Sequence, residues 1–246
     1  MSDGFFLADL PSDLALGGQM ELTGPEAHHA GVVRRLRPGE VVTVADGAGR
    51  GARGPVLTVE PGLVRLSVAE VLVAPPARPP ITVVQALPKQ DRGEIAVDLM
   101  TEVGVDAIVP WQAARSIVRW SGPRAAKALE RWRSAARQAA KQARRLTVPT
   151  VAELASTAQV VDLVGRAGQA VVCHESSNHP ISRLRPAEDL PLVCVIGPEG
   201  GLGEDEVAQL AQAGAEVVWL GPTVLRTSLA GSVAVTQLRL LAELDR

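Results

Sequence analysis

The sequence predicts an α/β protein in which a small β-rich domain precedes a larger domain with a parallel sheet. Residues 1–74 contain short strand-like segments separated by Gly or Pro turns. Residues 75–80 belong to the proline-rich stretch APPARPP, which cannot continue a helix or a strand. Residues 81–246 alternate apolar strand-like runs with helical patterns, and this alternation implies a parallel sheet. The predicted domains are therefore 1–74 and 81–246, joined by a stiff linker at 75–80.

The composition is that of a globular protein without a membrane anchor. The 246 residues are 46% apolar and 21% charged. No apolar run reaches the length of a membrane span, and the first ten residues lack the pattern of a signal peptide. The two cysteines, Cys173 and Cys194, lie within apolar runs, so buried thiols are expected rather than a disulfide or a metal site. These features predict a cytoplasmic protein that holds no metal.

The charge is distributed unevenly along the chain. The formal net charge is only −2, yet residues 115–145 carry ten Lys or Arg against the single acid Glu130. Residues 186–216 carry seven acids and no Lys or Arg. A local basic block can bind a polyanion in a nearly neutral protein, although such a helix can equally be a solvated face.

The elements of the small domain are indicated by its β-forming residues. Strands are expected within residues 20–24, 40–47, 54–62 and 63–73. The segment 24–36 between them has a helical pattern. A small β-barrel with one helix follows from this order.

The larger domain begins with a strand at 81–88, a helix at 94–103 and a strand at 107–111. A long helix starts at 121, with Pro123 in its first turn. Further elements are listed in chain order: strands at 170–175, 192–196 and 217–220, and helices at 205–213 and 231–244. The last helix is amphipathic, and we expect it at a dimer interface.

Two glycine-rich turns near the end of the chain are the main functional signal. The strands at 192–196 and 217–220 each end in Gly-Pro, and loops at the carboxyl ends of parallel strands are where α/β sheets bind ligands. The glycines at 197, 200, 201 and 203 do not form a dinucleotide fingerprint or a phosphate loop. The acidic residues 204–206 would repel a phosphate. We expect a pocket for a ligand without a phosphate there, the alternative being two tight turns with no ligand.

Residues 196–201 (IGPEGG) and 220–230 (LGPTVLRTSLA) resemble the RsmE family, the 16S ribosomal RNA uridine-N3 methyltransferases of the SPOUT superfamily. Residues 28–40, 89–120 and 141–149 are similar to further blocks of that family, in the same order. The resemblance implies a SPOUT trefoil-knot domain that binds S-adenosylmethionine, preceded by a PUA-like β-barrel. It also implies a homodimer acting on 16S rRNA in the small ribosomal subunit. The alternatives are a SPOUT methyltransferase for another RNA and a non-catalytic RNA-binding or ribosome-assembly factor.

The resemblance also implies which residues form the site. It places the cofactor on two sets of residues, namely Ile196, Gly197, Pro198, Glu199, Gly200 and Gly201, and Leu220, Gly221, Leu225, Arg226 and Thr227. It places RNA on His29, Arg34, Arg35, Arg37, Arg92, Arg115, Gln142 and Arg145. Each of these arginines can instead be ordinary surface charge, and His29 can have a capping or surface role.

Three residues are candidates for catalysis, since uridine N3 must lose a proton before it can accept a methyl group. Arg226 would stabilise charge on the uracil, or form a structural salt bridge, for example to Glu199. Glu199 would act as a base or fix its loop. Ser228 stands where the family pattern Arg-Thr-Glu-Thr-Ala has Glu, and we hypothesise that it holds the cofactor or the target. His174 and Glu175 end another strand and either border the same pocket or bind nothing.

Overall fold

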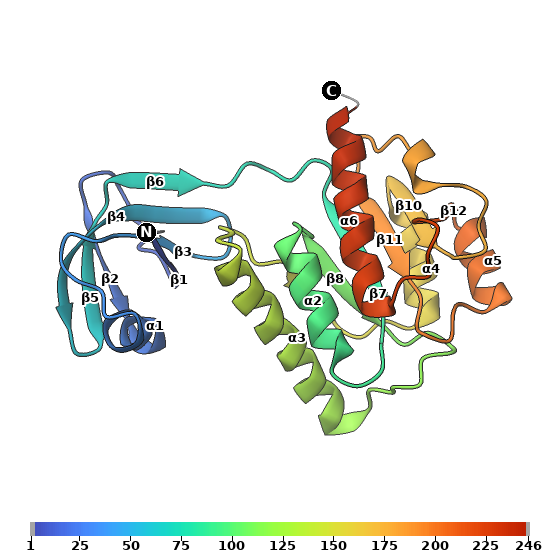
Figure 1. The fold of residues 1–246 in the computed structure, drawn as a ribbon, viewed down its shortest axis with the longest axis horizontal. Helices are drawn as coiled ribbons and strands as arrows, with labels where there is room; N and C mark the ends of the chain where they lie inside the picture. Colours follow the sequence, from blue (N-terminus) through green and yellow to red (C-terminus); the bar gives the residue numbers. More distant parts are fainter. Residues whose placement is uncertain (1–2, 245–246) are drawn as a thin grey trace. The chain divides into compact units, whose positions relative to one another are not determined.

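A computed structural model describes residues 3–244, which divide into two compact units (Figure 1). The first unit extends to Pro75 and also contains Ala140–Val148, and the second contains Pro76–Ala139 and the chain from Pro149 onward. The helix α3 (Gly122–Gln142) leaves the second unit and ends in the first. No helix within residues 3–244 combines the length and apolar character needed to cross a bilayer.

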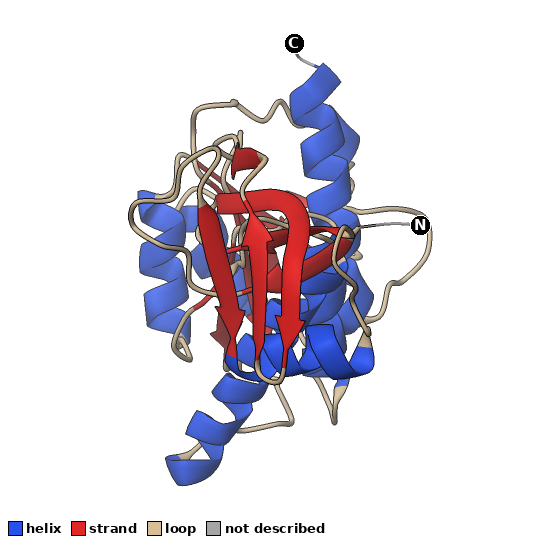
Figure 2. Cartoon of the chain, turned by 90° about the vertical axis from the view of Figure 1, so that its left-hand side faces the viewer, coloured by secondary structure: helices blue, strands red, loops and turns tan. Residues whose placement is uncertain are grey.

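The first unit is a six-stranded, mostly antiparallel β structure with one short helical segment (Figure 2). Its strands are β1 (Gly4–Leu7), β2 (Gln19–Thr23), β3 (Val41–Ala45), β4 (Arg50–Glu60), β5 (Leu63–Ser67) and β6 (Glu70–Val73). They pair in the order β1-β3-β4-β5-β2, with β6 also on β4, and only the β1–β3 pair is parallel. Alternate residues such as Met20, Leu22, Val64 and Leu66 point into the core, as the period of a strand requires.

Strand β4 holds the first unit together because it pairs with three neighbours. Its first half pairs with β3 and β6, and its second half pairs with β5 after a bulge between Val56 and Thr58. Gly54 lies at the bend, where a Cβ atom would lie 1.8 Å from the carbonyl oxygen of Ser67. Only glycine permits this close approach of two backbones.

The predicted helix of the small domain is split into α1 (Gly24–His28) and the π-helical turn η1 (His29–Val33). Ala27 and Ala30 pack into the core, and α1 contacts β2 and β5. The turn ends at Arg34 and is followed by Arg35 with φ 52°. A non-glycine residue in this left-handed region is uncommon and marks a specialised turn.

The segment that completes the first unit comes from the far side of the linker in sequence. Lys141 Nζ pairs with Glu26 Oε2 at 2.7 Å and lies 5.6 Å from the centre of the Phe6 ring. The backbone of Gly49 bonds to Leu146 O at 3.0 Å. Sequence patterns placed residues 140–148 in the larger domain, because such long-range contacts leave no periodic signal.

The second unit is built on a fully parallel six-stranded sheet, as the alternation of elements predicted. Its strands are β7 (Ile81–Ala86), β8 (Ala107–Trp111), β9 (Thr150–Val151), β10 (Gln169–Cys173), β11 (Leu192–Ile196) and β12 (Glu216–Val218). The order is β12-β10-β11-β7-β8-β9. All five residues of β11 are buried, which fits a central strand covered on both faces.

Helices cover both faces of this sheet. On one face, α2 (Arg92–Glu102) packs against α6 (Thr227–Leu244), which also contacts β7 and β11 (Figure 1). On the other face, α4 (Thr157–Arg166) and α5 (Glu204–Gln212) enclose an apolar cluster that includes Val84, Trp111 and Val195. The short η2 (Ile181–Arg183) also contacts α6.

The structure differs from the sequence prediction at several elements. The last helix begins at Thr227 instead of residue 231, so Ser228 belongs to its first turn. Strands β1 and β9 and helix α4 were not predicted, and the single run predicted at 63–73 forms two strands, β5 and β6. Helix α4 begins with a capping box between Ser156 and Gln159, a signal that the sequence does contain.

Candidate active site

Three loops meet at the carboxyl edge of the parallel sheet, after β10, β11 and β12. They are neighbours because β10 pairs with β11 on one side and with β12 on the other. The loop after β11 contains the first Gly-Pro sequence, and the loop after β12 contains the second. Their proximity, expected from the sequence, is therefore a consequence of strand order.

Two adjoining hollows open between these loops. The larger, of about 290 Å³, is bordered by Arg92, the β10 end, the first glycine-rich loop and residues 224–227. The smaller, of about 130 Å³, is bordered by the β10 end and residues 219–225. Most of the predicted cofactor residues lie on these walls: Ile196, Gly197, Pro198, Glu199, Gly201, Leu225, Arg226 and Thr227 on the larger, and Leu220, Gly221 and Leu225 on the smaller.

The backbone of the first loop is shaped by its glycines. Gly201 has φ +69°, and its N–H donates to Pro198 O at 2.9 Å, which closes a tight turn. At Gly197 a Cβ atom would lie 2.9 Å from Leu202 Cγ. Both glycines line the larger hollow, so main-chain atoms form its wall at these positions.

Glu206, a buried acid that the sequence analysis did not single out, fixes the end of this loop. Its Oε2 accepts the N–H of Gly203 at 3.2 Å, and its Oε1 accepts the N–H of Ala114 at 2.8 Å. Thr157 Oγ1 also approaches Oε1, at 3.4 Å. One carboxylate therefore joins the loop after β11 to the segment after β8. In the sequence, its position at N3 of α5, three residues after Gly203, could have identified it as a capping residue.

Glu199 is held by the start of α2. Its Oε1 accepts the N–H of Lys89 at 3.0 Å and lies 3.9 Å from Nη1 of Arg92. Of the two roles considered from the sequence, these contacts favour fixing the loop. They also place Arg92, expected to bind RNA, beside the larger hollow.

Arg226 and Ser228 have different environments although they are two residues apart. Arg226 is exposed on the wall of the larger hollow, and no ion pair joins it to Glu199 or to another acid within residues 3–244. Ser228 is 8% exposed in the first turn of α6 and does not border either hollow. The geometry thus leaves Arg226 available to a ligand and gives Ser228 a packing position.

Arg115 and Gly200, predicted for RNA and for the cofactor respectively, lie against each other. Arg115 Nη1 donates to Gly200 O at 3.4 Å, and a Cβ atom on Gly200 would lie 3.4 Å from Arg115 Cβ. Gly200 therefore faces the segment after β8, not the larger hollow. Arg115 therefore contacts the side of the glycine-rich loop that faces away from the larger hollow.

His174 and Glu175 border both hollows. The sequence had left two possibilities for this pair, either bordering the pocket or binding nothing. His174 Nδ1 lies 2.8 Å from Ser176 Oγ and accepts the N–H of Ser176 at 3.3 Å. Ser177 Oγ donates to Val217 O at 2.8 Å, which fixes the turn after β10. The side chain of Glu175 extends toward Gly201, where a Cβ atom would lie 3.9 Å from its Oε1.

The two cysteines are free thiols below this turn. Cys173 Sγ and Cys194 Sγ are 3.7 Å apart on neighbouring strands, and Cys173 borders both hollows. The hydrogen bond with Cys194 and burial raise the pKa of the Cys173 thiol well above its ordinary value. Cys173 is therefore a protonated group at neutral pH and a poor nucleophile. Among residues 3–244, no three His, Cys, Asp or Glu are grouped so as to hold a metal ion.

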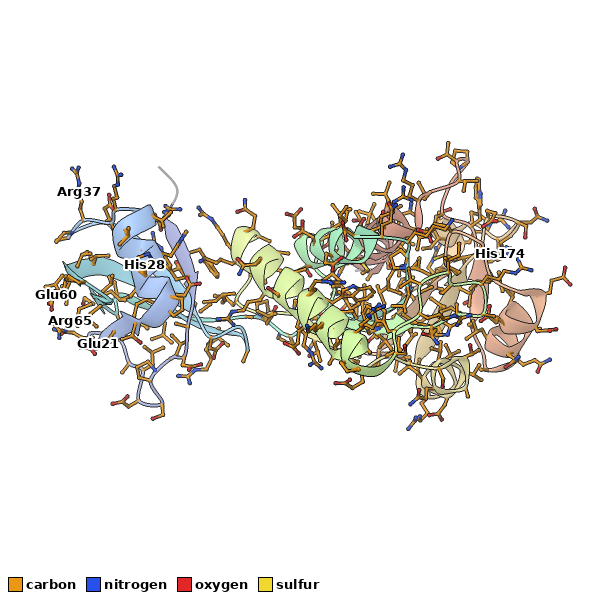
Figure 3. The ribbon with its side chains drawn as sticks, turned by 90° about the horizontal axis from the view of Figure 1, so that it is seen from below. Glu21, His28, Arg37, Glu60, Arg65 and His174 are labelled. Atoms are coloured by element: carbon orange, nitrogen blue, oxygen red, sulfur yellow. The ribbon has the colours of Figure 1, made fainter. Side chains whose placement is uncertain are left out.

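The other residues expected to bind RNA belong to the first unit. Arg34, Arg35, Arg37 and Gln142 are exposed, while His29 is half-buried with its ring 6.2 Å from that of Phe6. Arg145 Nη2 lies 3.3 Å from Thr147 Oγ1. Figure 3 shows Arg37 away from Arg65, which lies beside Glu21 and Glu60 at 2.9 Å from each. The Glu21 hydrogen bond raises the pKa of Arg65, so acids already neutralise that guanidinium.

Comparison with known proteins shows which family this chain belongs to. A model described as "RNA methyltransferase domain" matches residues 75–239, and one described as "RNA methyltransferase PUA domain" matches residues 22–59. Ribosomal RNA small subunit methyltransferase E of Mycobacterium bovis is 46% identical over 94% of this chain and 88% of its own length. The chain belongs to the ribosomal RNA small subunit methyltransferase E family.

Two further relatives support this assignment. The Bacillus subtilis family member is 33% identical over 92% of this chain and 91% of its own. A crystal structure of the Neisseria gonorrhoeae methyltransferase E, bound to S-adenosyl methionine, aligns with a TM-score of 0.84 and 28% identity over 98% of both chains. The predicted fold class, a SPOUT-type α/β domain preceded by a PUA-like domain, is confirmed, and so is the expected RNA methyltransferase class.

Proposed function

We propose that this protein transfers a methyl group from S-adenosylmethionine to N3 of a uridine in 16S ribosomal RNA. The observation that carries the proposal is the pair of adjoining hollows at the carboxyl edge of the parallel sheet. They occur in a member of a family in which the Neisseria gonorrhoeae protein was crystallised with this cofactor. The PUA-like unit with its exposed arginines supports RNA as the substrate.

The residues present suit S-adenosylmethionine. Apolar side chains such as Ile196, Leu202 and Leu225 line the hollows and can contact an adenine ring. Glycines expose the backbone for hydrogen bonds, and no phosphate-binding pattern is present. Glu199, the other acid of the larger hollow besides Glu175, complements the positive charge of a sulfonium or of an amino group.

The bound cofactor supplies an already activated methyl group, so the protein needs to orient the acceptor and control its protonation. Arg226, which lines the larger hollow, would stabilise negative charge that develops on the uracil ring. Glu199 and Glu206 keep the glycine-rich loop in place through the backbone bonds they accept. Because N3 is on the pairing edge, the uridine must be unpaired or extruded when it reaches the site.

The reaction is tested with small ribosomal subunits from a strain that lacks this gene, incubated with the purified protein and methyl-labelled cofactor. Nucleoside analysis should recover the label as 3-methyluridine from 16S rRNA. Label on a ribose 2′-hydroxyl, or transfer only to another RNA, would contradict the proposed target. Absence of cofactor binding in calorimetry would favour the non-catalytic RNA-binding alternative.

We also propose that the protein acts in the cytoplasm as a homodimer through the face formed by η2 and α6. An apolar groove of about 260 Å³ lies there, lined in part by Ile181, Trp219 and Leu241. Leu240 and Leu244 on α6 are 54% and 71% exposed. Exposed apolar side chains beside an apolar groove are typical of an interface.

The dimer is tested by replacing Leu240 with Glu. Light scattering after gel filtration should show a dimer for the wild type and a monomer for Leu240→Glu. Leu57→Glu, at a partly exposed leucine of the first unit, is the control that should stay dimeric. A monomeric wild type would contradict the proposal.

A further inference from the structure

The wall shared by the two hollows lies beside any methyl donor that occupies them, whether in one hollow or across both. Six residues border both hollows: Cys173, His174, Glu175, Val224, Leu225 and Ala230. In-line transfer requires the accepting atom to face the methyl group directly. The group that removes the N3 proton must lie at the same place, because a base acts within hydrogen-bond reach of the proton.

Two of the three ionisable groups on this wall are unsuited to accept a proton. Cys173 carries its own proton at neutral pH, held by Cys194 and by burial. His174 uses Nδ1 as an acceptor, because a backbone N–H such as that of Ser176 can only donate. With Nδ1 accepting, the ring carries a proton on Nε2, which makes that nitrogen a hydrogen-bond donor.

Glu175 is the remaining group, and its carboxylate is free. It is exposed at the end of β10, and within residues 3–244 it has neither an ion pair nor a hydrogen bond. Its Oε1 lies near Gly201, where a Cβ atom would be 3.9 Å away, and both residues line the larger hollow. The other acid of the larger hollow, Glu199, is instead occupied by the Lys89 N–H and by Arg92.

We propose that Glu175 is the general base that removes the N3 proton of the target uridine, an assignment that rests on the proposed function. The N3–H bond breaks, its electron pair stays on nitrogen, and the proton moves to the carboxylate of Glu175. The N3 electron pair forms the bond to the methyl carbon, and the S–CH₃ pair returns to sulfur. His174, which borders both hollows, would donate from Nε2–H to a uracil oxygen as the ring becomes negative.

The test compares Glu175→Gln with the matched control Glu204→Gln, which changes an exposed acid in the first turn of α5, outside both hollows. Single-turnover methylation of small subunits by Glu175→Gln should slow by about 100-fold. Calorimetry should give a cofactor Kd within about threefold of the wild type, since the amide keeps the shape of the side chain. Glu204→Gln should behave as the wild type in both measurements.

A pH series separates a base from a structural group. At high pH the substrate ionises at N3 without help, so the deficit of Glu175→Gln should shrink as the pH rises. A rate within threefold of the wild type, or a deficit that stays constant with pH, would overturn the assignment. If the wild type forms no 3-methyluridine, the proposed function itself fails. The charged and titratable groups that line the larger hollow together with Glu175 are Cys173, His174, Glu199, Arg226 and Arg92.

Discussion

The loops around the two hollows and the arginine-bearing turn of the first unit are both candidate binding surfaces, yet they are built differently. The loops are fixed by backbone bonds to buried or half-buried acids such as Glu206 and Glu199. The turn after η1 instead presents Arg34, Arg35 and Arg37 to solvent. A site held in one conformation loses activity when one of the contacts that fix it is removed. A charged surface distributes its affinity over many contacts, so each contributes little.

This difference predicts that the largest effect comes from a residue that touches no ligand. Glu206→Ala removes the acceptor of two backbone N–H groups, at Gly203 and Ala114, in a buried place. Leaving both unsatisfied should lower the free energy of unfolding by about 3 kcal/mol. Chemical denaturation measures this loss, and cofactor affinity should fall with it because the loop end is released.

Glu204→Ala is the control, since that exposed acid lies two residues earlier on the same helix. It should cost no more than about 1 kcal/mol through the helix dipole. Equal destabilisation by the two substitutions would show that the loop does not depend on the buried carboxylate.

The next effect concerns catalysis at the larger hollow. Arg226→Ala should reduce the single-turnover rate by about 100-fold, as expected when one charge-stabilising group is lost. The free energy of unfolding should stay unchanged, because Arg226 is exposed and unpaired within the described chain. Arg166→Ala on α4 removes an equal charge away from both hollows and should leave the rate unaltered. A large change in stability for Arg226→Ala would indicate a structural role.

The features that could be predicted from the sequence are those that depend on local patterns. The two Gly-Pro turns were located because apolar runs ending in glycine and proline are local patterns, and strand order then brings them together. The contacts of Glu199 with Lys89, 110 positions away, and of Lys141 with Glu26 leave no periodic trace. The last helix was predicted to start at residue 231, whereas α6 starts at Thr227, so the burial of Ser228 in its first turn is visible only in three dimensions.

The smallest effect is expected at the first unit, where two arginines allow a matched test. Arg37 is exposed, and its side chain forms no ion pair within residues 3–244, whereas Arg65 is shared between Glu21 and Glu60 (Figure 3). Arg37→Ala should weaken RNA binding about fivefold and reduce the dependence of log K on log salt by roughly 0.7, the loss of one phosphate contact. Arg65→Ala changes the net charge equally, but its guanidinium is already neutralised, so both quantities should stay as in the wild type. Filter binding over a salt series measures them. If the two variants lose affinity equally, overall charge and not the turn after η1 governs RNA binding by this unit.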